Sequence, residues 1–152
     1  MTSVCITGAD QVSALGCGLT DLAQAVDAAH GKAESVDFDL PGPGLLTVPL
    51  CRVKADLPSV APSKVPMDRN TAMALMVAQK AIQSAGISPD ALERDRLGVF
   101  WGSGMAGAST FDQTCHALYA EQRRIRPTSV VSTMPNAPVA EISLWAKAQG
   151  MT

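Results

Sequence analysis

Aromatic side chains, charges and long apolar runs are all scarce in this 152-residue chain, and each scarcity excludes a class of protein. Aromatic residues make up 4% and charged residues 17% of the sequence, and the formal net charge is −2, which leaves no electrostatic footprint for nucleic acid. The one basic run, residues 123–126, is short enough to be interpreted as a solvated loop instead of a phosphate-binding patch. No stretch approaches the roughly 18 apolar residues that span a membrane, and the N-terminus lacks the pattern of a signal peptide.

Cysteine and histidine are too few and too scattered to predict a metal site or a redox site. The four cysteines show no C-x-x-C spacing, so we expect reduced thiols in a cytoplasmic protein that needs no metal and no cofactor. These cysteines are Cys5, Cys17, Cys51 and Cys115. The histidines are His30 and His116 alone, and no G-x-S-x-G motif is present, so no Ser-His-Asp set is visible. His116 follows Cys115 directly, but neighbouring helical positions point about 100° apart, which argues against a nucleophile–base pair.

Alternating strand and helix patterns predict an α/β protein with a largely parallel sheet. Residues 3–8 and 97–102 are short apolar runs rich in β-formers, each closed by glycine, as is typical of buried strands. Between them, Thr20 is a plausible N-cap for a helix that ends at Gly31. After the second run we expect an amphipathic helix, an extended segment and a last helix, at residues 110–122, 127–135 and from Asn136 or Ala137.

The region of residues 32–66 is dominated by proline and glycine. It holds six of the ten prolines, with Pro41-Gly42-Pro43-Gly44 at its centre. Such punctuation predicts a long loop with at most one short strand, at residues 45–53. The region is too irregular in pattern to be a second domain.

The helix predicted from Asp68 to Ala85 is apolar around nearly its whole circumference. Only a narrow strip formed by Gln79, Lys80 and Gln83 is polar. A helix of this kind is buried on nearly all sides. One small sheet covers one face, so a second layer or another subunit must cover the rest.

A glycine-rich loop, Gly102–Gly107, follows the second predicted strand and has the form G-x-G-x-x-G. In dinucleotide-binding folds such a loop brings the backbone close to a pyrophosphate at a helix N-terminus. That fingerprint also needs a following strand that ends in an acidic residue. Glu121 falls inside or at the end of a helix, and the next strand-like run, residues 128–133, ends without a carboxylate. A dinucleotide-binding module through Gly102–Gly107 therefore stays as a second alternative.

Four segments in register resemble the N-terminal part of the β-ketoacyl-acyl-carrier-protein synthases, which have a thiolase-like fold. The opening resembles V-x-I-T-G…V-S-x-L-G, the next segment M-D-R…A-L-x-x-A-G-I, the third a strand ending in G-S-G, and the last M-x-P-N-x-x-A-x-x-I. The matching residues are 4–16, 67–87, 97–105 and 134–142. The resemblance implies that residues 1–152 are a ketosynthase-like N-terminal domain, incomplete relative to the family, and the first half of an αβαβα layered fold.

The resemblance also implies a reaction: acyl transfer to a cysteine, decarboxylation of malonyl carrier protein, and carbon–carbon bond formation. The family's nucleophilic cysteine lies at a helix N-terminus, and two histidines of its second half stabilise the developing charges. None of these residues has a counterpart here, so no catalytic residue is expected. The sequence ends at Gly150-Met151-Thr152, before the family presents that cysteine.

Positions near the acyl pocket can be transferred from the family. By resemblance, Met105 after Gly104 matches the residue that floors or gates the pocket, and Thr133 and Met134 before Asn136 match the segment that meets a partner subunit. The alternative is that both methionines only fill the core, since thioethers adapt to irregular cavities.

Two interpretations of the chain follow. The first is a subunit of the chain-length-factor type, which lacks the nucleophile and forms a heterodimer with an active ketosynthase in fatty acid or polyketide synthesis of the aryl polyene type. It would meet acyl carrier protein through that complex. The alternative is the N-terminal fragment of an active β-ketoacyl-acyl-carrier-protein synthase.

Overall fold

A computed structural model describes residues 3–29, 31–39, 44–58 and 61–152. The chain divides into two compact units, one formed by residues 10–56 and the other by residues 1–9 together with 57–152. We describe each unit by itself. His30 and the Pro41-Gly42-Pro43 centre of the predicted loop lie outside the described residues.

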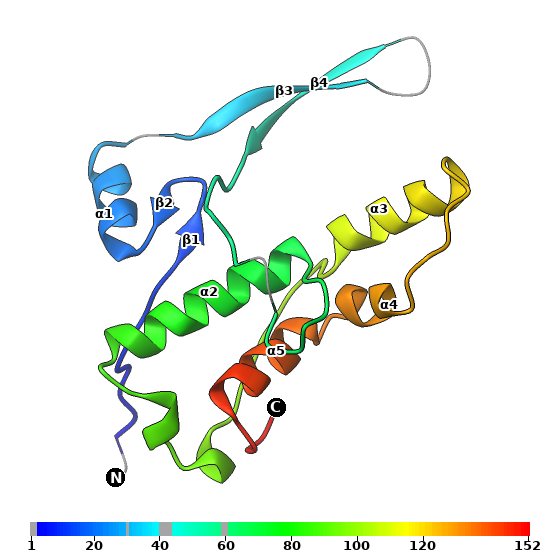
Figure 1. Cartoon of the computed structure of the whole chain (residues 1–152). Helices are drawn as coiled ribbons and strands as arrows, with labels where there is room; N and C mark the ends of the chain where they lie inside the picture. Colours follow the sequence, from blue (N-terminus) through cyan, green and yellow to red (C-terminus); the bar gives the residue numbers. More distant parts are fainter. Residues whose placement is uncertain (1–2, 30, 40–43, 59–60) are drawn as a thin grey trace. The chain divides into compact units, whose positions relative to one another are not determined.

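The unit of residues 10–56 is built from two hairpins and one helix (Figure 1). The strands β1 (Val12–Ser13) and β2 (Gly16–Cys17) pair antiparallel and lead into α1 (Leu19–Asp27). The helix begins after Gly18, whose φ of 90° suits glycine alone, so the predicted N-cap at Thr20 is wrong.

A second hairpin in this unit corrects the prediction of a loop with at most one strand. The strands β3 (Ala33–Asp39) and β4 (Leu45–Cys51) pair antiparallel over seven residues each. Pro49 lies within β4 opposite Ser35. A two-stranded sheet has only edge strands, so a proline is tolerated where its missing N–H would face outward. Proline content therefore misled the prediction.

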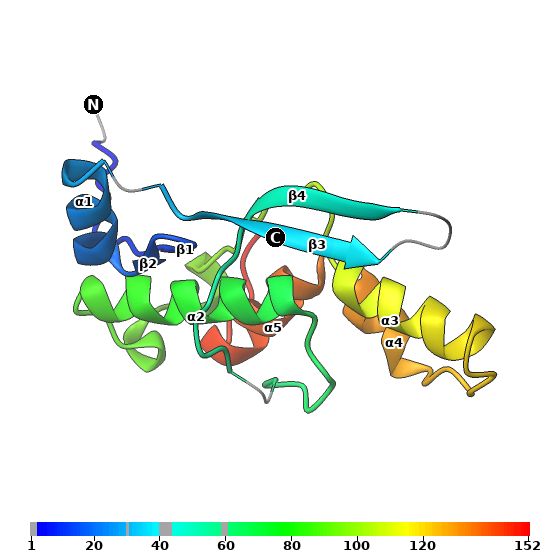
Figure 2. The same cartoon turned by 90° about the horizontal axis from the view of Figure 1, so that it is seen from above.

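The other unit packs its longest helix against its last one. The helix α2 (Arg69–Ser84) begins at Asp68, whose side chain accepts a hydrogen bond from Asn70 N, and it confirms the predicted helix. The helix α5 (Ala137–Ala146) runs beside α2 in both views (Figures 1 and 2). Ala74, Leu75 and Ile142 form the buried core between them. The polar strip stays the most accessible side of α2, because Lys80 and Gln83 are exposed.

Two further helices and two short turns complete this unit. The 3-10 turns are η1 (Pro89–Ala91) and η2 (Arg94–Arg96), and the helices are α3 (Ala108–Tyr119) and α4 (Thr128–Thr133). Figures 1 and 2 show α4 beside α3. The extended segment predicted here is wrong, because residues 128–133 are helical despite their β-branched side chains. Pro127 favours the helix start, and Ser132 Oγ donates to Thr128 O at 3.2 Å and to Pro66 O at 2.6 Å.

The two predicted strands at residues 3–8 and 97–102 have no regular secondary structure. The strands that are described form two antiparallel pairs, so the expected parallel sheet is absent from the described part of the chain. A strand exists only when a neighbouring strand satisfies its N–H and C=O groups. Residues 3–8 and 97–102 do not pair with each other, and β-propensity alone does not hold them in a ladder.

Candidate functional site

The predicted pocket residues lie on two segments that the structure brings together. Gly104 and Met105 belong to the irregular segment before α3, and Met105 is 80% exposed. Gly107 caps α3 in the left-handed conformation with φ of 72°. A Cβ atom on Gly107 would lie 2.4 Å from the Cα atom of Thr133. The glycine-rich loop therefore rests directly on the end of α4, and only glycine permits this contact.

The residues after this contact differ in exposure. Thr133 is half-buried, and its Oγ1 donates to Val130 O at 2.9 Å. Met134 is 43% exposed and is the C-cap of α4. Asn136 precedes α5, as predicted, and borders a hollow of about 520 Å³ that residues 99–102 also line. Neither Met105 nor Met134 fills the core of this unit.

A buried carboxylate, Asp68, fixes the start of α3 relative to α2. Asp68 is 3% exposed, and besides Asn70 N it accepts hydrogen bonds from Thr110 N and Thr110 Oγ1, both at 2.9 Å. One carboxylate thus satisfies N–H groups at the N-termini of two helices, where negative charge is favourable. No local signal in the sequence links Asp68 to Thr110, which lies 42 positions further along the chain.

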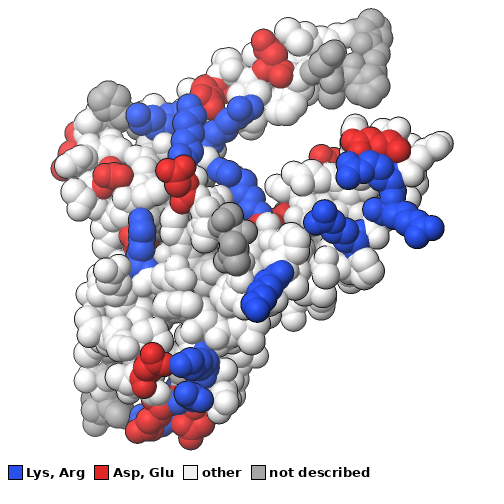
Figure 3. Space-filling model, viewed as in Figure 1, with Lys and Arg blue, Asp and Glu red and all other residues white. Residues whose placement is uncertain are grey.

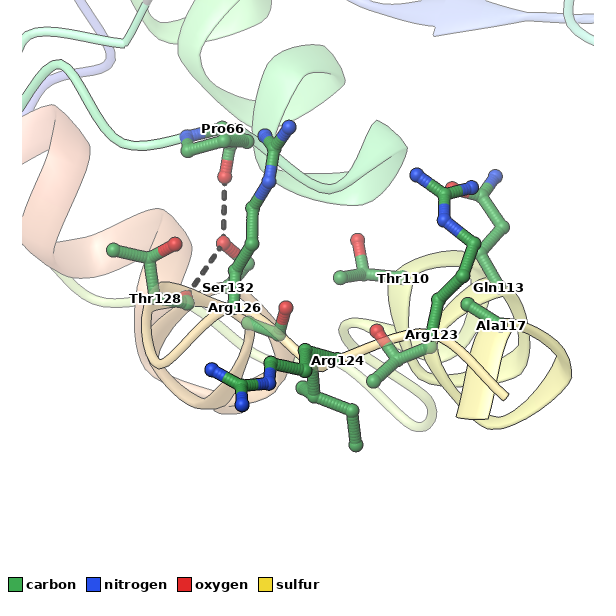
Figure 4. Close-up of a pocket in the computed structure, with 12 residues that line it drawn as sticks. Pro66, Thr110, Gln113, Ala117, Arg123, Arg124, Arg126, Thr128 and Ser132 are labelled. Carbon is green, nitrogen blue, oxygen red and sulfur yellow. Dashed lines mark hydrogen bonds between the residues drawn. The ribbon is translucent and has the colours of Figure 1, made fainter. Parts of the chain in front are cut away.

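A groove of about 220 Å³ lies between α3 and α4, hereafter the arginine groove (Figure 4). Hydroxyl groups and three arginines line it. The residues that matter here are Thr110, Ser132, Arg123, Arg124 and Arg126. In Figure 4, Arg123 and Arg126 extend on either side of the gap that holds Thr110, whereas Arg124 points away from it. The segment Pro66–Asp68 anchors both walls, through Ser132 to Pro66 O and through Thr110 to Asp68.

The charge of this region is only partly neutralised. Figure 3 shows basic side chains gathered over the end of α3 and the segment that follows it. Arg123 Nη1 donates to Glu121 Oε2 at 3.0 Å, and this hydrogen bond, with the charges of Arg123 and His116, holds the pKa of Glu121 below 4.5. Arg124 and Arg126 have no carboxylate within 4 Å among the described residues. The groove thus presents one free guanidinium group, that of Arg126, beside hydroxyls, a combination suited to phosphate or carboxylate ligands.

The thiols are not placed for nucleophilic catalysis. Cys5 lies in irregular backbone, Cys17 in β2, Cys51 in β4, and Cys115 in the interior of α3. In the described part of the chain, no cluster of three His, Cys, Asp or Glu side chains is arranged to hold a metal ion. None of the described helices is long and apolar enough to cross a membrane.

The dinucleotide-binding interpretation loses its second strand. After Gly102–Gly107 the chain forms α3, but the strand-like run that should follow is the helix α4. Glu121, the acidic residue that was considered for binding ribose, lies after the end of α3 and pairs with Arg123 and His116. No described strand follows this loop in the chain, so the ribose-binding carboxylate at the end of a following strand is missing.

Comparison with known proteins identifies the family. A model described as "Beta-ketoacyl synthase, N-terminal domain" matches residues 46–152. A 3-oxoacyl-[acyl-carrier-protein] synthase 2 from Staphylococcus aureus is 32% identical over 85 residues, which are 55% of this chain and 21% of that protein. The same protein from strain COL is also 32% identical over 85 residues and is covered to 20%.

A solved structure shows the fold. The crystal structure of a β-ketoacyl synthase from Burkholderia phymatum superposes with a TM-score of 0.74 at 23% identity, over 99% of this chain and 38% of that one. The predicted first half of a thiolase-like layered fold is confirmed, although the parallel sheet is not formed within the described residues. The chain spans about a fifth of the length of the curated relatives that it matches.

Proposed function

This chain belongs to the β-ketoacyl synthase family, and from that premise we propose that it is a ketosynthase-like subunit without a nucleophile. It acts as a partner of the chain-length-factor type for an active β-ketoacyl-acyl-carrier-protein synthase, in fatty acid or aryl polyene-like polyketide elongation. The observation that carries the proposal is the placement of the four cysteines: none lies at a helix N-terminus. A condensing thiolate is activated by such a position, so this chain alone does not condense.

The contact between the glycine-rich loop and α4 supports a role in shaping an acyl pocket. Gly107 rests against Thr133, so Met105 and Met134 are carried by two segments in direct contact. Both thioethers are accessible, at 80% and 43% exposure. We propose that a second subunit covers this region and that Thr133, Met134 and Met105 then limit the depth of the acyl pocket, with Gly104 and Asn136 at its border.

The arginine groove supports contact with an acyl carrier protein. The curated relatives are named for acyl-carrier-protein substrates. A carrier protein presents its acyl chain on a phosphopantetheine arm, and the phosphate of that arm suits a groove with a free guanidinium group. Arg126 is the candidate because it extends beside the groove and has no ion-pair partner among the described side chains.

Mutations in the groove test this contact. Arg126→Ala in the co-expressed complex should weaken carrier-protein binding about fivefold, the size expected for losing one exposed charge contact of about 1 kcal/mol. Arg96→Ala is the matched control, because Arg96 is also exposed, on η2, but pairs with Glu93. Equal affinities for the two variants, measured by titration calorimetry, would exclude the groove as the carrier-protein site.

The alternative is the N-terminal part of an active synthase. The small share of each relative's length that this chain matches favours this alternative. The share is 38% for the solved β-ketoacyl synthase and about a fifth for the curated relatives. The transcript distinguishes the two functions directly. If the reading frame continues beyond Thr152 into a cysteine at a predicted helix start, the partner role is wrong and the chain is part of the catalytic subunit.

Product length tests the partner role. The full chain is co-expressed with the active ketosynthase encoded beside it, and native mass spectrometry establishes the complex. Met134→Trp and Thr133→Trp should then shorten the acyl products without abolishing condensation, because a bulkier residue reduces the pocket depth. Val130→Trp is the control, since Val130 lies on α4 and is 65% exposed but is not one of the proposed pocket residues. Unchanged product length in an intact Met134→Trp complex would remove the gating role.

A further inference from the structure

The arginine groove carries less net positive charge than the number of its arginines indicates. Arg123 lines the groove, but its Nη1 atom donates a hydrogen bond to Glu121 Oε2 at 3.0 Å. The other oxygen of this carboxylate lies 3.4 Å from His116 Nδ1. Arg126 lines the same groove and has no carboxylate within 4 Å among the described side chains. One guanidinium group of the groove is therefore neutralised, and one is free.

Glu121 is fixed in place as a negative charge beside the groove. Its backbone N–H donates to His116 O at 3.3 Å, and Arg123 N donates to Ala117 O at 2.8 Å, so both residues are tied to the last turn of α3. The hydrogen bond from Arg123 lowers the pKa of Glu121, which keeps the carboxylate ionised at neutral pH. The side chain is 42% exposed, so solvent weakens its field without removing it.

Neutralisation does not remove Arg123 as a hydrogen-bond donor. A guanidinium group has several N–H groups, and the contact with Glu121 engages one nitrogen, Nη1. The hydroxyls are less available as donors, because Thr110 Oγ1 and Ser132 Oγ each donate to an acceptor within the protein. A phosphate in the gap therefore meets guanidinium donors on either side (Figure 4). The two guanidinium groups and Glu121 together carry a single positive charge.

We propose that Glu121 is a specificity-determining residue, which lowers the affinity of the arginine groove for phosphate monoesters more than for phosphate diesters. This inference rests on the proposed contact with the phosphopantetheine arm. The arm of a carrier protein contains a phosphate diester, which has one negative charge. Free phosphopantetheine and coenzyme A contain a phosphate monoester, whose charge at neutral pH is about −1.5 to −2. Glu121 thus favours the arm that is attached to a carrier protein over the free forms of the same arm.

The selectivity follows from Coulomb's law. The repulsion between Glu121 and a ligand is proportional to the charge of the ligand, so a dianion is repelled about twice as strongly as a monoanion at the same place. Affinity depends exponentially on this energy, so the factor for the diester is roughly squared for the monoester. An exposed charge at this range changes the affinity for a monoanion about twofold, which makes the expected factor for a dianion about fourfold.

Two small ligands with the same arm test the effect. 4′-Phosphopantetheine is the monoester, its methyl ester is the diester, and the chemical shifts of the Arg126 side chain report binding to the full chain at low salt. Glu121→Gln should raise the affinity for the monoester about fourfold and for the diester about twofold. Glu93→Gln is the matched control, because Glu93 is also exposed and paired with an arginine, Arg96, but lies at the start of η2 and does not line the groove. It should change neither affinity.

The possible results separate the role of Glu121 from the role of the groove. Equal gains for the two ligands in Glu121→Gln, or the same gains in Glu93→Gln, overturn the selectivity. So does a gain that persists in high salt, because a Coulomb effect is screened there. The groove remains the carrier-protein site in each of these cases if Arg126→Ala still weakens carrier-protein binding. Absence of any shift at Arg126 with either ligand overturns both the selectivity and the proposed phosphate contact.

Discussion

Removing the Asp68 carboxylate is the most direct test of how this unit holds together. Asp68 is 3% exposed and accepts three hydrogen bonds of 2.9 Å, one from Asn70 N and two from Thr110. In Asp68→Ala, α2 loses its N-cap, and the N–H and hydroxyl of Thr110 lose their acceptor.

The expected loss can be built from these contacts. An N-cap is worth about 1 kcal/mol. Each hydrogen bond to a charged partner is worth about 1.5–3 kcal/mol, but the two from Thr110 share one carboxylate and do not add fully. We therefore expect Asp68→Ala to lower the free energy of unfolding by about 3–4 kcal/mol. Thr110→Val keeps the Thr110 N–H bond and should lose about 1 kcal/mol.

Urea denaturation of the full chain measures these losses. Asp112→Ala is the matched control, because Asp112 is an exposed acidic residue of α3, the helix that Asp68 holds through Thr110, and its removal should change stability by less than about 0.5 kcal/mol. The double variant Asp68→Ala with Thr110→Val should lose less than the sum of the single losses, because both remove the same hydrogen bond. If Asp68→Ala loses under about 1 kcal/mol, or no more than Asp112→Ala, the carboxylate does not tie α3 to α2.

Three further substitutions test other parts of the structure. Leu75→Ala, at a side chain 2% exposed, should lower the free energy of unfolding by about 2–5 kcal/mol in urea denaturation, and a smaller loss would argue against the core between α2 and α5. Gly107→Ala should lower the free energy of unfolding in urea by more than about 1 kcal/mol, because φ of Gly107 is 72° and Thr133 blocks the new Cβ atom. Gly102→Ala is the control, because a Cβ atom at Gly102 would meet open space. The pKa of Glu121 should be lower than that of an ordinary glutamate by NMR titration, because Arg123 donates a hydrogen bond to it, and Arg123→Gln should raise that pKa. A lowered pKa stabilises the folded state above that pKa, so any stability difference between these two proteins should vanish in acid. An unchanged titration in Arg123→Gln would contradict the ion pair.

The helices of the larger unit were predictable because their signals are local. Asp68 followed by an apolar run predicted α2 almost to the residue, and the predicted start at Asn136 or Ala137 agrees with α5. The register of four motifs also identified the family, which the match over residues 46–152 confirms. Residues 4–16 lie outside that match, so the family model does not test the first of those motifs.

The strands were less predictable because pairing is not a local property. Residues 3–8 and 97–102 have the composition of buried strands but remain irregular in the described structure. By contrast, β4 forms where one short strand was predicted, and its partner β3 forms in a stretch that was predicted to be loop. Residues 128–133 were predicted to be extended but are helical. Their β-branched side chains favour strand, but the two hydrogen bonds of Ser132 and the preceding proline favour helix.

Sequence by itself determined most of the helical segments and the family to which they belong. The tertiary structure alone decided the contacts between distant residues: Asp68 reaches Thr110 across 42 positions, and Ser63 N donates to the buried Glu141 across 78. It also placed Gly107 on Thr133 and gathered the basic run around a groove instead of leaving it a plain loop. The physical reason is that propensity and capping act within a few residues, whereas burial, charge placement and strand pairing depend on what folding brings alongside.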